Sequence, residues 1–121
     1  MTTDPYSAQV RELFTATAHA GRLDGGEAVY LDEQDVRIRL TVTVDGGRVA
    51  AMRFEAWGCP HLIAAAEAAC AALESRSVAD LLEFSTSGLM DNLPVPVEKT
   101  GRILVLEDAV RSLGRRFRDE S

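Results

Sequence analysis

Apolar and polar residues alternate in the middle of the chain, and this alternation predicts an antiparallel sheet. Between residues 36 and 44 every second residue is Val, Ile or Leu, and those between them are Arg or Thr. A period of two is typical of a strand with one buried face. Asp45-Gly46-Gly47 is a hairpin turn signal, so residues 48–57 are predicted to return as a second strand. Residues 27–32 add a short third strand.

Helical signals flank the predicted sheet on both sides. Asp4 or Pro5 can begin a first helix that extends to about Ala18. After the sheet, Ser77 with Asp80 three residues later resembles a capping box. The predicted helices after the sheet cover residues 60–75, 78–84 and 103–118, with one helical turn at 87–92 and loops in the rest of 85–101. This order predicts an α+β fold in which the helices pack on one face of the sheet.

The composition is that of an ordinary globular protein. The chain has 121 residues, of which 46% are hydrophobic and 26% are charged, and this length predicts a single domain over residues 1–121. No apolar run approaches the ~18 residues of a membrane span. The first residues lack the basic start and apolar core of a signal peptide, which predicts a cytoplasmic location.

The charge argues against a nucleic-acid partner. The formal net charge is −6, whereas broad binding of nucleic acid needs a basic face. Basic residues do gather between Lys99 and Arg118, where six stand against two acidic residues. That segment is either a solvated face of the last helix or a docking surface for an acidic partner.

Cys59 is the first candidate for chemistry. It stands in Trp57-Gly58-Cys59-Pro60, where the returning strand runs into the helix predicted from residue 60. Proline is well placed at the first helical position, so Cys59 falls at the N-cap. The positive end of the helix dipole favours the thiolate, which attacks electrophiles and binds metal. The alternative is a small buried residue at a bend.

Other polar residues complete the list of candidates. His61 can bind a metal with Cys59 or stabilise its thiolate, or be a first-turn histidine without such a role. Cys70 lies eleven residues after Cys59, about 16 Å along a continuous helix, and is therefore assigned to the core. Glu33 and Asp35 precede the long strand as ordinary loop carboxylates, unless the fold brings them beside Cys59.

The chain resembles the IscU/NifU-type scaffold proteins of iron–sulfur cluster assembly. Three stretches carry the likeness: the opening residues Tyr6-Ser7 with Val10 and Phe14, the hairpin over 35–59 that ends in an aromatic-Gly-Cys, and the closing stretch 95–113. The resemblance covers nearly the whole chain. It implies the SufE/NifU-like fold and a role without enzyme activity.

The resemblance also implies a site at one end of the sheet. In the family, three cysteines and an aspartate there hold a nascent [2Fe–2S] cluster or a zinc ion. The aspartate matches at Asp35 and one cysteine matches at Cys59. The other two cysteine positions hold Glu33 and Arg102 instead. Arg102 can pair with Asp35 or Glu33, or lower the pKa of Cys59.

Three hypotheses follow for the function. The first is a divergent scaffold-like protein that binds iron, an iron–sulfur cluster or zinc through Cys59, Asp35, Glu33 and His61, or that binds no metal and only contacts the assembly machinery. Its expected partners are a cysteine desulfurase or other assembly proteins, with no nucleic acid and no membrane. The second is a SufE-like acceptor that takes persulfide sulfur onto Cys59.

The third hypothesis is a partner-binding module without thiol chemistry. Its surface would be the basic last helix or residues 93–99, LPVPVEK. The family has a Leu-Pro-Pro-Val-Lys segment at this place that a dedicated chaperone reads. Here one proline of the pair is missing and Glu98 precedes Lys99.

Overall fold

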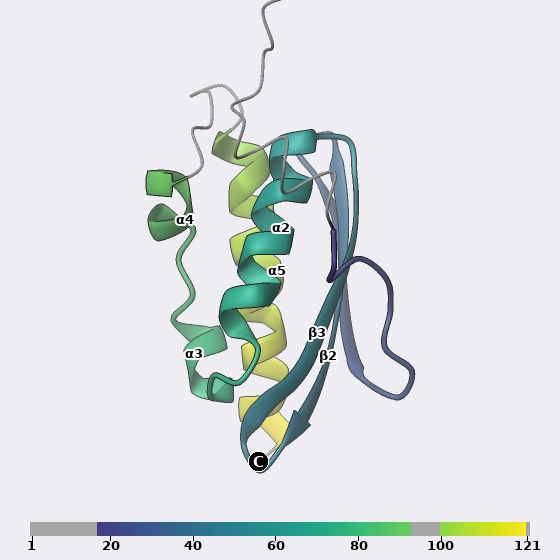
Figure 1. Ribbon diagram of the computed structural model, residues 1–121, viewed down its shortest axis with the longest axis vertical. Coiled ribbons are helices and arrows are strands. Elements are labelled where there is room, and N and C mark those ends of the chain that lie inside the picture. The colour runs from purple at the N-terminus through teal and green to yellow at the C-terminus, as the bar shows by residue number, and fades with distance from the viewer. Residues whose placement is uncertain (1–16, 93–99, 121) are drawn as a thin grey trace, which may run out of the picture.

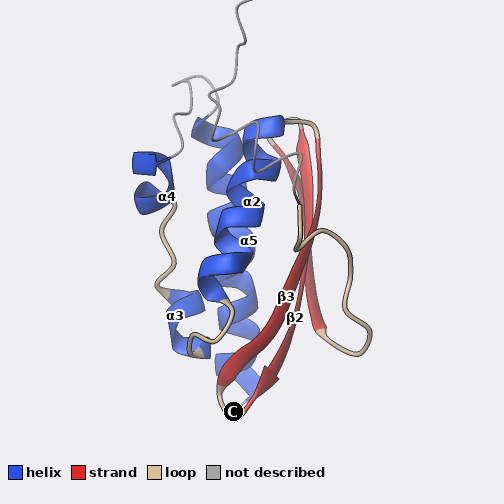
Figure 2. Cartoon of the chain, in the orientation of Figure 1, coloured by secondary structure: helices blue, strands red, loops and turns tan. Residues whose placement is uncertain are grey.

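The computed structural model describes residues 17–92 and 100–120, apart from the side chains of 90–92, 119 and 120. Figures 1 and 2 show a sheet with two long helices along one face and two short helices beyond them. The strands are β1 (Glu27–Glu33), β2 (Val36–Asp45) and β3 (Arg48–Trp57), and the helices are α2 (Pro60–Leu73), α3 (Val78–Leu82), α4 (Ser87–Asn92) and α5 (Thr100–Glu120). The predicted α+β fold with an antiparallel three-stranded sheet is confirmed.

The alternation of side chains sets the register of the sheet. The strands are antiparallel in the order β1-β2-β3, and Leu40 lies between Val29 and Phe54 on the two neighbouring strands. All three side chains are buried beneath α2 and α5, while Arg37 and other polar residues face outward. A slip of one residue would expose this whole face, so the hydrophobic pattern strongly specifies the register.

The two long helices cover the inner face of the sheet. Helix α2 packs on β3, and α5 packs on β1, β2 and α3. Four alanines and Cys70 on α2 are buried, and side chains this small permit a close approach to the sheet. The apolar face of α5 is buried completely and consists of Ile103, Leu106, Ala109, Val110 and Leu113.

Several predicted boundaries are wrong. Helix α2 ends at Leu73 and not at Ser75, because Glu74 is extended and Ser75 has φ of 74°. Helix α3 ends at Leu82, and the Ser77 side chain makes no capping bond, so the predicted capping box is absent there. Helix α5 begins at Thr100, three residues before the predicted start. The predicted helix over 4–18 lies outside the described residues except for 17 and 18, which are not helical.

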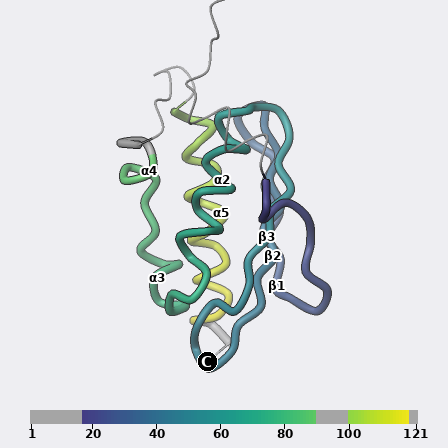
Figure 3. The backbone as a smooth tube through the Cα atoms, in the orientation of Figure 1, coloured from purple at the N-terminus to yellow at the C-terminus, as the bar shows by residue number. Residues whose placement is uncertain are grey.

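The segment before β1 runs along the free edge of β3. Ala20 forms an isolated parallel bridge with Phe54, and Figure 3 shows this part of the chain beside β3 before it loops out toward β1. Further along the same edge, Arg48 bridges to Ser77. The edge of β3 is therefore paired at two places, which limits its use as a template for other strands. Among the described residues, no helix is long and apolar enough to cross a membrane.

Candidate functional site

Cys59 lies at the junction between β3 and α2. Strand β3 ends at Trp57, Gly58 follows with φ of 108°, and Cys59 is the extended N-cap before Pro60. A Cβ atom added to Gly58 would lie 2.8 Å from the backbone oxygen of Asp35. Only glycine combines this φ with so close an approach. The junction that carries Cys59 is therefore pressed against the turn that carries Asp35.

The turn between β1 and β2 has two residues in the left-handed region. Gln34 has φ of 54° and Asp35 has φ of 62°. Two positive φ values are those of a type I′ hairpin turn, whose twist matches that of the strands. This turn leaves the Glu33 and Asp35 side chains exposed at the end of the sheet.

The start of α5 reaches the same end. A Cβ atom on Gly101 would lie 3.4 Å from Oε1 of Gln34, so the helix begins against the β1–β2 turn. The half-buried Arg102 comes next. Within the described residues, Arg102 forms no ion pair with Asp35 or Glu33, which was one of the two roles that the sequence allowed for it. Three segments distant in sequence nevertheless converge as the resemblance implied.

Cys59 and His61 form a buried pair. Cys59 is 2% exposed and His61 is 4% exposed, and the Sγ atom lies 4.0 Å from Nδ1 of His61. At this distance the sulfur and the imidazole nitrogen can share one proton in a long, weak hydrogen bond. The structure thus brings these two predicted site residues together, but it places both beneath the surface.

Comparisons with known proteins identify the family. A family model of the NifU-like N terminal domain matches residues 5–118. The chain belongs to this family. The predicted resemblance is confirmed, and membership supports the predicted scaffold-like role in iron–sulfur cluster assembly. No curated protein sequence is significantly similar to the chain.

Solved structures of similar proteins show the same fold. A nitrogen-fixing NifU-like N-terminal protein from Brucella abortus is 14% identical, with a TM-score of 0.76 and coverage of 95% of each chain. A protein described as hypothetical is 19% identical, with a TM-score of 0.69 and coverage of 89% of this chain and 95% of the other. A candidate iron–sulfur cluster assembly scaffold of the SUF system from Fervidobacterium islandicum is 14% identical, with a TM-score of 0.60 and coverage of 87% and 81%.

The ligand set of this NifU-like domain does not form a closed metal site. Among residues 17–92 and 100–120, no three His, Cys, Asp or Glu side chains are grouped so that they can hold a metal ion. Iron–sulfur clusters are held mainly by thiolates, and Cys59 is the one thiol at this end of the sheet. The described residues of one chain therefore do not fit a [2Fe–2S] cluster. The set Cys59, Asp35, Glu33 and His61 stays a prediction.

The second thiol of the NifU-like domain is in the core, as predicted. Cys70 is fully buried in the middle of α2. Burial, with smaller contributions from the charges of Glu67 and Glu74, raises the pKa of the Cys70 thiol far above its ordinary value of 9.0. Cys70 thus stays protonated and unreactive, which makes it a matched control for experiments on Cys59.

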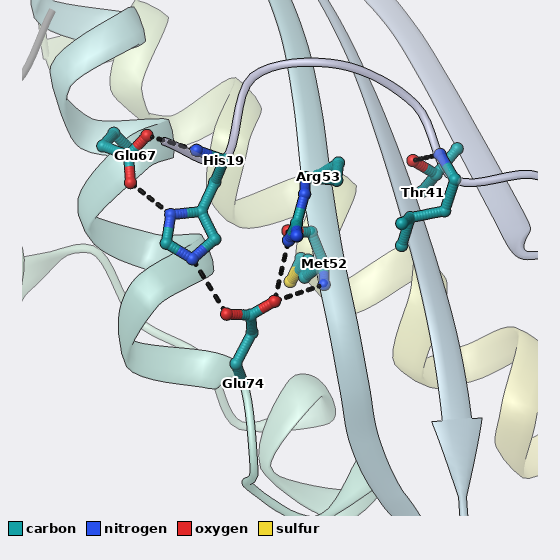
Figure 4. Close-up of polar contacts among 7 residues, drawn as sticks. His19, Thr41, Met52, Arg53, Glu67 and Glu74 are labelled. Atoms are coloured by element: carbon teal, nitrogen blue, oxygen red, sulfur yellow. Dashed lines mark hydrogen bonds and ion pairs between the residues drawn. The ribbon is translucent and has the colours of Figure 1, made fainter. Parts of the chain in front are cut away.

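A partly buried polar network could not be predicted from the sequence. His19 contacts Glu67 and Glu74, which lie 48 and 55 residues later, and Glu74 also contacts Arg53 (Figure 4). The sequence contains one indication of such a network, which is Glu67 in an otherwise apolar, alanine-rich helix. A charge buried there is rarely left without a partner. The partner itself could not be inferred from spacing.

Proposed function

We propose that this protein is a scaffold-like component of iron–sulfur cluster assembly, without enzyme activity, in which Cys59 is the working thiol. The observation that carries the proposal is the position of Cys59 at the start of α2, on a junction that Gly58 locks against the Asp35 turn. Cys59 is the N-cap of a helix of 14 residues, and the start of a helix is a recurrent position of reactive cysteines. Membership in the NifU-like family supports the choice of pathway.

The cargo at this site would be a metal ion or an unfinished cluster. Cys59 would supply a thiolate, His61 an imidazole nitrogen, and Asp35 and Glu33 carboxylate oxygens. Iron and zinc accept all three kinds of donor. Because both carboxylates are exposed and Cys59 is buried, loading would require the Cys59 side chain to become accessible on the side of the β1–β2 turn.

A cysteine desulfurase or another assembly protein is the proposed partner. The SUF-system description of the Fervidobacterium islandicum neighbour supports this choice. A partner of this kind would also supply sulfur and further ligands, which the described residues lack. The cytoplasmic location stays a prediction. The partner-binding role of residues 93–99 also stays a prediction, because these residues lie outside the described part of the chain.

Anaerobic dialysis against ferrous iron or zinc tests the proposed ligand role of Cys59. The wild type, Cys59→Ser and Cys70→Ser would be compared for metal bound per chain. We expect the wild type and Cys70→Ser to retain metal and Cys59→Ser to lose most of it, because serine is a far poorer ligand for these ions. Equal binding by Cys59→Ser and the wild type would overturn the ligand role.

A second candidate function is acceptance of persulfide sulfur, as in SufE-like proteins. It is favoured by the single thiol at the site, because sulfur transfer needs one nucleophile and no cage of ligands. The Cys59 thiolate would attack the outer sulfur of a desulfurase persulfide. That sulfur would become bonded to Cys59, and the desulfurase cysteine would leave as a thiolate, with no net oxidation.

Mass spectrometry distinguishes this second role. After incubation with a cysteine desulfurase and free cysteine, Cys59 would gain the mass of one sulfur atom, and Cys70 would not. If no adduct forms on Cys59 although the desulfurase is active, the acceptor role is excluded. If Cys59→Ser retains partner binding in the same mixture while losing the adduct, then docking and sulfur acceptance are separate properties of the surface.

A further inference from the structure

His19 is held between two carboxylates of the α2 region. Its Nδ1 contacts Oε2 of Glu67, and its Nε2 lies 2.8 Å from Oε1 of Glu74 (Figure 4). Its backbone N–H also donates to Oε1 of Glu67 at 2.8 Å. Both ring nitrogens can donate to these oxygens only when the imidazole is protonated, because a neutral ring must present one lone pair to a carboxylate.

The surrounding charges reinforce this requirement. Arg53 on β3 donates to Oε2 of Glu74 at 2.8 Å, and the backbone N–H of Met52 donates to the same oxygen at 2.9 Å. The charged groups that face His19 from α2, its C-terminal cap and β3 are thus two carboxylates and one guanidinium, with the neutral Cys70 thiol nearby. The cluster is electrically neutral only when His19 carries a proton.

The pKa of His19 reflects this arrangement. Burial lowers the pKa of His19, but the hydrogen bonds and charges of Glu67 and Glu74 outweigh burial, so the net pKa is raised above 6.5. The side chain is 17% exposed, so the proton can exchange with solvent. The contacts are therefore complete at slightly acid pH and weaken as the pH rises through the raised value.

The same residue fastens its segment to the free edge of β3. The backbone N–H of Phe54 donates to the oxygen of His19 at 2.9 Å, and the N–H of Gly21 donates to the oxygen of Phe54 at 2.8 Å. The segment from Thr17 to Gly21 is thus held by backbone bonds on its β3 side and by the imidazole on its α2 side. The backbone N–H of His19 adds its bond to Glu67, and Arg22, which follows the segment, pairs with Glu55 on β3.

This segment forms one wall of a cavity of about 490 Å³ beside the Cys59 junction. Thr17, Ala20 and Gly21 line it together with Trp57 and Ile63. Trp57 precedes Cys59 by two residues, and the N–H of Ile63 donates to the backbone oxygen of Cys59 at 3.1 Å. A displacement of the segment would therefore widen the cavity at residues adjoining Cys59, whose own side chain is 2% exposed and does not line the cavity as described.

We propose that His19 is a proton-controlled latch, which holds the Thr17–Gly21 segment between α2 and the edge of β3 when protonated and releases it when neutral. Release opens the cavity beside Cys59. The latch thus controls access to the thiol, and this consequence rests on the proposed role of Cys59. The opening itself is independent of that role.

Amide hydrogen exchange across about pH 6 to pH 9 tests the latch. The exchange rate of the Phe54 and Gly21 amides, corrected for the pH dependence of free peptide, reports opening of the segment. The control is the amide of Val49, which donates to the backbone oxygen of Arg76 at 2.8 Å on the same edge of β3 but away from His19. We expect protection of Phe54 to fall by up to about tenfold per pH unit above the pKa of His19, and protection of Val49 to stay level.

Two variants separate the latch from a general loss of structure. His19→Gln should show weak, pH-independent protection of Phe54. Glu67→Gln keeps a side-chain oxygen for the His19 backbone N–H but removes the negative charge beside the imidazole. The midpoint of the pH-dependent loss of Phe54 protection should therefore move to lower pH. Level protection of Phe54 in the wild type, or identical pH profiles for the wild type and Glu67→Gln, would overturn the proposal.

Access to the thiol is measured separately, at one fixed pH near 6.5, so that wild type and variant are compared under the same conditions. Alkylation of Cys59 should be faster in His19→Gln than in the wild type, while Cys70 stays unmodified in both. If exchange shows the opening but alkylation of Cys59 is unchanged, the latch does not control this site. If Cys59 binds neither metal nor sulfur but both readouts respond, the proposed function fails and the latch stands.

Discussion

Gly58 is the residue on which the geometry of the candidate site depends most. Its φ of 108° is in a region that side chains disfavour, and an added Cβ atom would meet the Asp35 oxygen at 2.8 Å. The Asp35 oxygen is a backbone atom, so it cannot move aside as the end of a flexible side chain could. The glycine thereby sets the distance between the Cys59 junction and the β1–β2 turn.

Gly58→Ala should destabilise the protein by about 2–4 kcal/mol, because positive φ and the contact with Asp35 both oppose a side chain. Gly46→Ala is the matched control, since Gly46 has φ of 60° but nothing within 4 Å of an added Cβ atom. We expect the control to lose only about 1–2 kcal/mol. Urea denaturation measures both, and equal losses would show that the Asp35 contact has no energetic role.

At the scale of elements, the His19 network joins β3 to α2 and its C-terminal cap. Burial raises the pKa of Glu74, but hydrogen bonds from Met52, His19 and Arg53 outweigh burial and lower it below 4.5. Its contribution to stability is therefore present above pH 4.5 and is lost as the pH falls through the lowered value. The contribution of His19 is full below pH 6.5 and is lost as the pH rises through its raised pKa.

The free energy of unfolding should therefore depend on pH in a way that His19→Gln removes. Between about pH 4.5 and 6.5 the wild type should exceed the variant by about 2 kcal/mol, the usual magnitude for hydrogen bonds to charged groups. The difference should shrink above and below this window. Denaturation at a series of pH values measures it, and a difference that grows toward pH 9 would show that the sign of the linkage is wrong.

Helices α3 and α5 meet at Gly114. A Cβ atom there would lie 2.8 Å from the backbone nitrogen of Leu82 and 3.0 Å from Cβ of Leu81. Alanine improves helix propensity by about 1 kcal/mol, but overpacking against backbone costs about 1–3 kcal/mol. We expect Gly114→Ala to be neutral or destabilising by up to about 2 kcal/mol.

Gly101→Ala on the same helix provides the comparison for this contact. Its added Cβ atom would meet only the flexible end of Gln34, at 3.4 Å, so the gain in helix propensity should prevail and thermal stability should rise. A gain of equal size from Gly114→Ala would mean that α3 is free to shift away from α5.

At the scale of the whole molecule, the sheet was predictable and its contacts with distant segments were not. Alternating residues in β2 and the Asp45-Gly46-Gly47 turn indicated the hairpin, because period and turn chemistry are local properties. The start of α5 was misplaced because Gly101 is a typical loop residue, whereas the structure places it in the first turn of the helix, against Gln34.

The candidate site was predictable only in part. The N-cap position of Cys59 followed from Pro60 and the end of β3, and the convergence of the Asp35 turn and the start of α5 followed from the family resemblance. The depth of Cys59 and the position of His61 beside it depend on packing, which spacing does not reveal. The His19 network links residues about 50 positions apart, so no local pattern could indicate it.

The central claim is that Cys59 is the working thiol of a scaffold-like protein, and anaerobic reconstitution tests it most directly. The wild type, Cys59→Ser and Cys70→Ser would be incubated with ferrous iron, sulfide and a thiol reductant, and then separated from unbound ions. Iron and sulfide per chain and the visible absorption of a cluster would be measured. The wild type and Cys70→Ser should retain iron, and Cys59→Ser should retain almost none. Equal retention of iron and equal absorption in Cys59→Ser and the wild type would contradict the claim.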